Sequence, residues 1–233
     1  VHTRAGLGVQ APPVRVEVHL AGGLPRFTIV GLPETAVRES KERVRAALDN
    51  CHFELPRKAF IVNLSPADMP KEGGRFDLPI AIGLLAACDL LNPLAMQALP
   101  DYEFIGELGL YGELRTVRGT MPAARACANA NRAFIIPADC AAEAALAKGA
   151  TVLGAAHLTE VVAHLSGQTS LDFAHHEPNY IGPQYPDLED VRGQPSARRA
   201  LEVAASGGHN LLMLGPPGTG KTTEMMKAIK KRL

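Results

Sequence analysis

Neither sign of charge is in excess in this sequence, which also lacks long hydrophobic runs and closely spaced cysteines. Basic and acidic side chains number 24 each, so the net charge does not indicate nucleic-acid binding. Such binding would require a local basic patch on the surface. The longest apolar stretch, 78–88, is much shorter than the roughly 18 residues of a membrane helix. Residues 1–4 contain neither a signal-peptide hydrophobic region nor an initiator methionine. We therefore expect a cytoplasmic protein with no membrane partner that has lost a few N-terminal residues.

The residues that most often bind metals are spaced too widely for a site. The cysteines form no C-x-x-C pair, so neither a zinc site nor a redox motif is indicated, and we interpret them as buried free thiols: Cys51, Cys88, Cys127 and Cys140. Adjacent residues of a strand point to opposite faces, and no cysteine or carboxylate stands at ligand spacing from His175 and His176. We interpret this histidine pair as part of a solvated linker.

The hydrophobic pattern predicts a mixed fold. Hydrophobic residues make up 46% of the 233 residues, which is enough for a globular core. Alternation and β-rich runs predict strands at 14–20, 27–30, 58–64, 133–136 and 151–153, with a hairpin across 103–115 that turns near Tyr111 and Gly112. Helical patterns cover 33–50, 78–91, 121–130, 141–148 and 158–165. This order predicts an α+β (mixed α/β) domain over residues 1–166.

A second domain is predicted after a linker. Glycine and proline punctuate the polar segment 167–186, which has the composition of a linker. From Asp187 a new pattern begins, with a helix at 196–205 and a short buried strand at 210–214. We therefore divide the chain into residues 1–166, 167–186 and 187–233.

The strongest motif follows that strand and fits G-x-x-x-x-G-K-[ST] in full: Gly215, Pro216, Pro217, Gly218, Thr219, Gly220, Lys221 and Thr222. Its glycines permit backbone angles at which amide N–H groups close around phosphate oxygens. Lys221 is predicted to reach the β- and γ-phosphates, and the Thr222 hydroxyl to bind Mg²⁺. A strand before the loop and a helix after it favour an ATP site over a chance surface turn.

Phosphate binding alone does not give hydrolysis. A metal-binding carboxylate on a neighbouring strand and an arginine finger are also needed, and in P-loop families these lie downstream of the loop. Few residues follow Thr222, so we expect no hydrolysis and weakened nucleotide binding by this chain. The basic tail 223–233 is interpreted as a solvated helix face, with a DNA contact as the alternative.

Several long motifs in a fixed order give a family resemblance. They lie at residues 1–5, 31–34, 63–68, 70–79 and 106–108, and with them the chain from Val1 to Thr222 closely resembles the ComM/YifB family of bacterial magnesium chelatase-like AAA+ ATPases. The resemblance implies a ribosomal-S5-domain-2-like, Lon-protease-like domain followed by the truncated start of a P-loop AAA+ α/β domain. It also implies that Val191 and Gln194 lie near the adenine, with an ordinary helix entry as the alternative. The tail 223–233 does not resemble the family.

The Lon-like resemblance raises the question of peptidase activity. Matched residue by residue, Arg75 stands at the position of the serine nucleophile and Met121 at that of the catalytic lysine. Neither can perform Ser–Lys chemistry, so we expect a proteolytically inactive domain. Ser65 is a weak substitute nucleophile because it precedes Pro66 at a strand end.

The charged loop 70–79 has two interpretations. It contains Lys71, Glu72, Arg75 and Asp77 around two glycines. It either contacts DNA, a partner or a neighbouring subunit, or is a tight loop whose charges pair with each other while Phe76 and Leu78 anchor it.

Four functions remain open from the sequence. By resemblance, the full-length protein is a homohexameric, ATP-driven DNA helicase that promotes branch migration in recombination during natural transformation, with ATP and Mg²⁺ as cofactors. The alternatives are a non-enzymatic module that binds a partner or assists ring assembly, a chelatase-type ATPase, and a Ser–Lys peptidase.

Overall fold

A computed structural model describes residues 1–175 and 193–218, and the chain divides into two compact units, Val1–Glu177 and Pro178–Leu233. Each unit is described by itself. In the part of the chain that the structure describes, no helix is long and apolar enough to cross a membrane.

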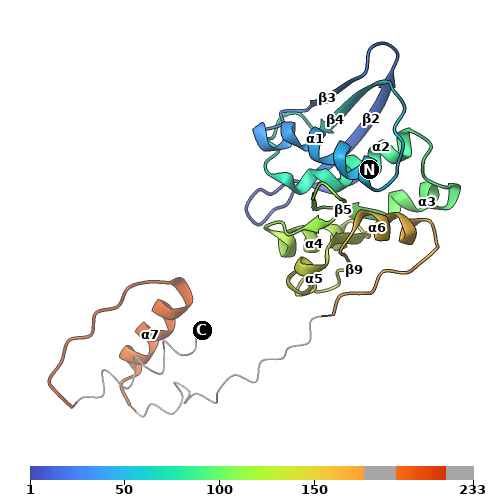
Figure 1. Cartoon of the computed structure of the whole chain (residues 1–233). Helices are drawn as coiled ribbons and strands as arrows, with labels where there is room; N and C mark the ends of the chain where they lie inside the picture. The colour runs from blue at the N-terminus through green and yellow to red at the C-terminus, as the bar shows by residue number, and fades with distance from the viewer. Residues whose placement is uncertain (176–192, 219–233) are drawn as a thin grey trace. The chain divides into compact units, whose positions relative to one another are not determined.

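The first unit is built on a seven-stranded mixed sheet with the order β3-β4-β2-β1-β5-β8-β9 (Figure 1). β2 is antiparallel to both β1 and β4, and the remaining neighbours are parallel. The strands are β1 His2–Arg4, β2 Pro13–Ala21, β3 Arg26–Val30, β4 Ala59–Ser65, β5 Tyr102–Phe104, β8 Ala133–Pro137 and β9 Val152–Ala155. A separate hairpin pairs β6 Glu107–Leu108 with β7 Leu114–Arg115.

Helices cover both faces of this sheet, one face more completely than the other. They are α1 Thr35–Asn50, α2 Asp77–Ala87, α3 Pro93–Ala98, α4 Thr120–Asn129, α5 Ala138–Ala144 and α6 Leu158–Leu165. The main core joins α1, α2, α3 and α6 to the sheet, whereas α4 and α5 pack on the opposite face at the β8–β9 end (Figure 1). β8 shows the division, because Ile135 lies in the main core and Phe134 and Ile136 lie in the second core.

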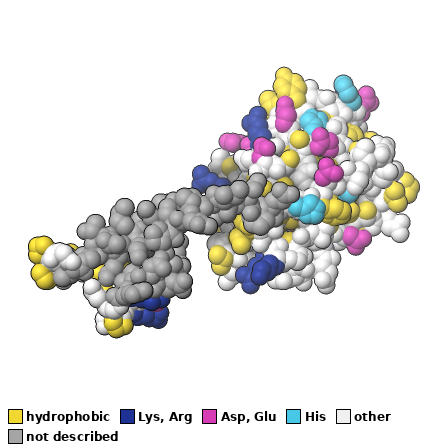
Figure 2. Space-filling model, turned by 90° about the horizontal axis from the view of Figure 1, so that it is seen from below, with side chains coloured by type: hydrophobic (Ala, Val, Ile, Leu, Met, Phe, Trp, Pro, Cys, Tyr) yellow, Lys and Arg dark blue, Asp and Glu magenta, His cyan; other side chains and the backbone are white. Residues whose placement is uncertain are grey.

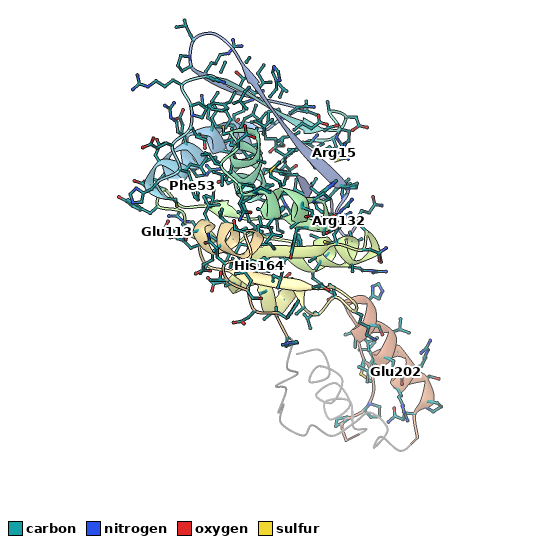
Figure 3. All side chains as sticks on the ribbon, turned by 90° about the vertical axis from the view of Figure 1, so that its right-hand side faces the viewer. Arg15, Phe53, Glu113, Arg132, His164 and Glu202 are labelled. Carbon is teal, nitrogen blue, oxygen red and sulfur yellow. The ribbon has the colours of Figure 1, made fainter. Side chains whose placement is uncertain are left out.

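The face opposite the main core is open to solvent at the β2–β4 end. Val14 and Val16 of β2 are buried, while Arg15, Glu17 and His19 between and beyond them are exposed. Arg15 is labelled on β2 in Figure 3. Another face of the first unit, seen in Figure 2, carries basic, acidic and histidine side chains interspersed rather than one dominant sign of charge.

One histidine fixes the segment that follows α6. The Leu171 N–H donates to His164 Nδ1 over 3.1 Å, and His164 Nε2 bonds the Tyr102 hydroxyl over 3.1 Å. Leu171 is buried, and Ala174 N–H donates to the Val152 carbonyl. Residues 167–175, the start of the predicted linker, therefore pack on the first unit. Residues 176–186 of that linker lie outside the described ranges.

Most predicted elements of the first unit are confirmed. The strands at 14–20, 27–30, 58–64, 133–136 and 151–153 correspond to β2, β3, β4, β8 and β9, and the helical segments to α1, α2, α4, α5 and α6. The helix predicted at 141–148 is shifted, because α5 begins at Ala138 and ends at Ala144. In α1 the predicted apolar face of Val37, Val44 and Leu48 is fully buried. The hairpin is present in the shorter form β6–β7, while β5 joins the main sheet.

The prediction that a helix covers 78–91 is wrong at its end, and β1 and α3 were not predicted. α2 ends at Ala87 because Asp89 adopts a left-handed conformation (φ 56°) and the Leu90 N–H turns back to the Leu85 carbonyl. This closing pattern satisfies carbonyls that the helix leaves free.

All four cysteines are free thiols, as predicted, but only Cys127 and Cys140 are buried. Cys51 and Cys88 are half-buried, which corrects the prediction that all of them are buried.

The described part of the second unit consists of one helix and an extended segment. α7 Pro195–Gly207 confirms the helix predicted at 196–205, and it ends where Gly208 takes a left-handed conformation. Arg198 and Arg199 form ion pairs with Glu202 of the same helix, and Glu202 is labelled in Figure 3.

Candidate functional site

The segment leading into the phosphate loop alternates as a strand would but forms no strand. Leu211 and Met213 pack against Leu201 of α7, while Leu212 and Leu214 are 81% and 87% exposed. The prediction of a buried strand at 210–214 is therefore wrong for this structure. A strand needs backbone partners in a sheet, and no described residue provides one.

The structure describes the first half of the phosphate loop. Gly215, Pro216, Pro217 and Gly218 are exposed, and Gly218 adopts φ 83°, a conformation open to glycine. Open space lies around its Cα where a side chain would project. Because proline has no N–H, the two prolines can shape the loop but cannot donate to a phosphate. Donors in this loop must come from Gly215, from Gly218 and from the residues after it.

Of the other residues predicted to contact the nucleotide, the structure describes only Gln194. Thr219, Gly220, Lys221, Thr222 and Val191 lie outside the described residues. Gln194 lies directly before α7 in a left-handed conformation, and its carbonyl accepts the Arg198 N–H over 3.1 Å. The structure thus places Gln194 at a helix entry, and its position relative to an adenine remains a prediction.

In the first unit, three of the sequence motifs converge on a fourth, the loop 70–79. Lys71 exchanges backbone hydrogen bonds with the motif at 31–34, through Leu32 and Glu34. Its ammonium donates to the carbonyls of Pro66 and Met69, at the motif 63–68 and just after it. On the other side, the Gly106 N–H donates to the Arg75 carbonyl, and the Gly106 carbonyl accepts the Leu78 N–H. Motifs separated by more than seventy positions therefore form one structure, which we call the motif junction.

The charged side chains of this loop do not pair with each other. Arg43 of α1 binds Asp77 through two hydrogen bonds, Nε to Oδ2 at 2.7 Å and NH2 to Oδ1 at 3.1 Å. Asp77 also accepts the Leu108 N–H, and its carboxylate raises the pKa of the Arg43 guanidinium through the hydrogen bond. Lys71 is held by backbone carbonyls.

The two interpretations of the loop are therefore settled in part. Phe76 and Leu78 are fully buried and anchor it, as the tight-loop interpretation predicted. Self-pairing of its charges is wrong, because Asp77 and Lys71 bind groups outside the set and Arg75 has no ion pair among the described residues. Sequence reasoning missed Arg43, whose position on α1 gave no signal of a partner 34 residues later.

The geometry around the protease-equivalent positions supplies no Ser–Lys pair. Arg75 is buried, and Met121 is 43% exposed at the start of α4. Ser65 ends β4 and precedes a cis peptide bond to Pro66. Burial lowers the pKa of the nearby Lys71 ammonium, but this group donates to two backbone carbonyls, and no hydrogen bond joins it to Ser65 within residues 1–175.

The described residues contain no cluster of side chains that is suited to metal binding. Within residues 1–175 and 193–218, no group of three or more histidine, cysteine, aspartate or glutamate side chains could hold an ion. His175 is exposed, and His176 lies outside the described residues.

Comparison with known families gives the class of the protein. The family described as "Subunit ChlI of Mg-chelatase" matches residues 16–140, and "Magnesium chelatase, subunit ChlI" matches residues 187–232. Both units of the chain thus fall in the magnesium chelatase-like class.

Sequence similarity to curated proteins identifies the family within this class. The competence protein ComM of Haemophilus influenzae is 51% identical over 95% of this chain and 44% of its own length. The YifB protein of Escherichia coli is 49% identical over 95% of this chain and 43% of its length, and a Mycobacterium tuberculosis protein, Rv2897c, is 38% identical over 92% and 42%. The chain therefore belongs to the magnesium chelatase-like ComM/YifB family, and it spans less than half the length of these relatives.

Proposed function

We propose that the second unit begins an ATP-binding module of the AAA+ class and that residues 215–222 hold the phosphates. The observation that carries this proposal is the complete G-x-x-x-x-G-K-[ST] motif inside the segment that matches the magnesium chelatase family. The left-handed Gly218 supports it, because such a residue turns successive N–H groups toward one concavity.

Each residue has a distinct role in this proposal. The amides from Gly218 to Lys221 bind phosphate oxygens, the Lys221 ammonium neutralises the terminal phosphates, and the Thr222 hydroxyl binds Mg²⁺. Bound Mg²⁺ supplies charge neutralisation for phosphoryl transfer. Val191 and Gln194 are proposed to lie near the adenine.

Nucleotide titration tests the loop directly. A fluorescent ATP analogue is titrated into the chain with Mg²⁺, and Lys221→Ala is compared with Lys148→Ala, which removes an equal charge from an exposed site of the first unit. We expect Lys221→Ala to weaken binding by about tenfold or more, the loss of a charge-assisted bond. Equal affinity of the two variants would remove the loop from the binding site.

For the full-length protein we propose an ATP-driven, homohexameric DNA motor acting in recombination during natural transformation. The name of the Haemophilus relative, a competence protein, supports this role. A local patch also supports it. A pocket of about 360 Å³, which we call the basic groove, is lined by one acidic residue, Asp49, and by the cations Arg26, Arg45, Arg57 and Lys58. Clustered cations of this kind bind phosphates without reading sequence.

Salt dependence tests the basic groove. Each phosphate contact contributes about 0.9 to the slope of log K against log salt for duplex DNA. The double variant Arg57→Ala/Lys58→Ala of the full-length protein is therefore expected to lower this slope by about 2, while Arg125→Ala/Lys148→Ala leaves it unchanged. A slope equal to that of the parent would exclude the groove, and failure to unwind forked DNA with ATP and Mg²⁺ would exclude the motor.

The first unit is proposed to be a Lon-like, proteolytically inactive domain that binds a partner or assists ring assembly. The absence of a Ser–Lys pair at the motif junction supports inactivity, and the unpaired Arg75 supports binding. Cleavage of peptides that depends on Ser65 would contradict it. The chelatase-type alternative would be favoured instead if the full-length protein inserted a metal ion in an ATP-dependent way.

A further inference from the structure

Arg75 is the one buried charged side chain in the described residues that lacks a counterpart. The buried charged residues are Arg4, Lys71, Arg75, Asp77 and Glu103. Arg4 pairs with Glu103, Asp77 with Arg43, and Lys71 with backbone carbonyls. Arg75 is 7% exposed, and its Nε and NH2 atoms have no hydrogen-bond partner. Burial of an unpaired guanidinium is costly, and it lowers the pKa of Arg75.

This guanidinium lines a pocket of about 490 Å³ at the motif junction, which we call the Arg75 pocket. Much of its wall is main chain, because glycines line it at positions 6, 8, 73, 74 and 119. A side chain at Gly6 would collide with Arg75 NH1, and one at Gly74 with the carboxylate of Glu107. A side chain at either glycine would therefore displace one of these two charged groups.

The start of α4 adds positive potential to the same pocket. Gly119, which lines it, adopts φ 70° directly before the helix, and no side chain caps the first turn. Uncapped N–H groups and the helix dipole both attract negative charge. The Thr120 hydroxyl, next in the chain, is also buried without a partner. Arg118 contributes a second guanidinium from the exposed side.

Two carboxylates limit which anion the pocket can accept. Glu72 and Glu107 line it together with the arginines, so a doubly charged phosphate meets repulsion as well as attraction. A singly charged carboxylate leaves Glu72 and Glu107 free to accept hydrogen bonds from N–H or O–H groups of the same ligand. A guanidinium also matches a carboxylate through two parallel hydrogen bonds.

We propose that the Arg75 pocket binds the carboxylate of an organic ligand that also offers N–H or O–H donors, with Arg75 as the anchoring residue. This chemistry is present at a peptide chain end and in an aspartate or glutamate side chain of a partner. The site is independent of the phosphate loop, so it can fail or hold without affecting the ATP proposal.

Titration of the whole chain by NMR tests this site. The Nε–Hε signals of arginine and the backbone amides of Gly74 and Gly119 are followed on addition of N-acetylglycine, N-acetylaspartate amide, acetate or inorganic phosphate. N-acetylglycinamide serves as a matched probe without the carboxylate. N-acetylglycine and N-acetylaspartate amide separate the chain end from the side chain as sources.

We expect one of the two donor-bearing carboxylates to shift the Arg75 signal and to bind about tenfold or more tighter than N-acetylglycinamide and phosphate. Arg75→Gln should remove this difference, whereas Arg125→Gln, which removes an exposed arginine of α4, should retain it. No shift with any carboxylate, or equal binding of phosphate, would overturn the proposal.

Thermal unfolding gives a second readout that does not depend on the ligand. If Arg75 is kept for binding, Arg75→Met should raise the Tm of the ligand-free chain by a few degrees, because it removes a buried unpaired charge. N-acetylglycine or N-acetylaspartate amide should raise the Tm of the parent and not that of Arg75→Met. A lower Tm for Arg75→Met, together with no ligand effect on the parent, would show a purely structural role.

Discussion

Replacing Glu103 by glutamine should strongly destabilise the first unit. Glu103 of β5 is 1% exposed and accepts two hydrogen bonds from Arg4 of β1, Nε to Oε2 at 2.6 Å and NH2 to Oε1 at 2.8 Å. Arg132, labelled in Figure 3, adds a third at 3.1 Å. Glutamine keeps the volume but has one acceptor oxygen and no charge.

The magnitude follows from what remains after the substitution. Arg4 is 6% exposed, so Glu103→Gln leaves a buried guanidinium without its counter-charge, at a cost of about 3–5 kcal/mol. Arg132 is partly exposed and contributes less, about 0.2–1 kcal/mol. Because β1 has three residues and joins β2 to β5 in the centre of the sheet, the loss should affect the whole unit.

Urea unfolding followed by far-UV circular dichroism measures this effect, since the chain has no tryptophan. Glu54→Gln, at an exposed position, is the matched control and should change the free energy of unfolding by less than about 0.5 kcal/mol. The double variant Arg4→Met/Glu103→Leu should recover most of the loss, because no charge stays buried. A change below about 1 kcal/mol for Glu103→Gln would refute the reasoning.

Two further predictions concern titratable groups, the buried Cys127 and the half-buried His164. Burial raises the pKa of the Cys127 thiol to about 12, so in the folded chain iodoacetamide should alkylate Cys127 far more slowly than Cys88. Mass spectrometry measures both alkylation rates, and comparable rates for the two cysteines would contradict this prediction. Burial lowers the pKa of folded His164 below 6.5, so the unfolded chain takes up the proton first and the free energy of unfolding should fall as the pH drops below about 6.5. His164→Gln should make this fall shallower in urea titrations across that range, and an unchanged pH dependence would show that His164 is not its source.

The sequence predicts regular elements well where one period dominates. α1 carries its buried residues at helical spacing, and β2 alternates Val14 and Val16 with exposed polar residues. β1 was missed because two of its three residues, Thr3 and Arg4, are polar although both are buried, and the distant partner of Arg4, Glu103, gives no local signal. α3 was missed because six residues are too few for a helical pattern.

The sequence predicted the phosphate loop better than the motif junction, for a related reason. The phosphate loop is contiguous, so its motif is visible in one segment. The motif junction is assembled from segments far apart in the chain, and the pairing of Asp77 with Arg43 depends on how α1 packs. The prediction of a strand at 210–214 was wrong for the same reason. A strand forms only where other segments of the chain supply its backbone hydrogen-bond partners.

The central claim, that main-chain amides of the phosphate loop bind a polyphosphate, is tested most directly by ¹H–¹⁵N spectra recorded during ATP titration with Mg²⁺. We expect large shifts of the Gly218 and Gly220 amides that saturate with ATP and disappear in Lys221→Ala. ATP binding that leaves both glycine amides unshifted would contradict it.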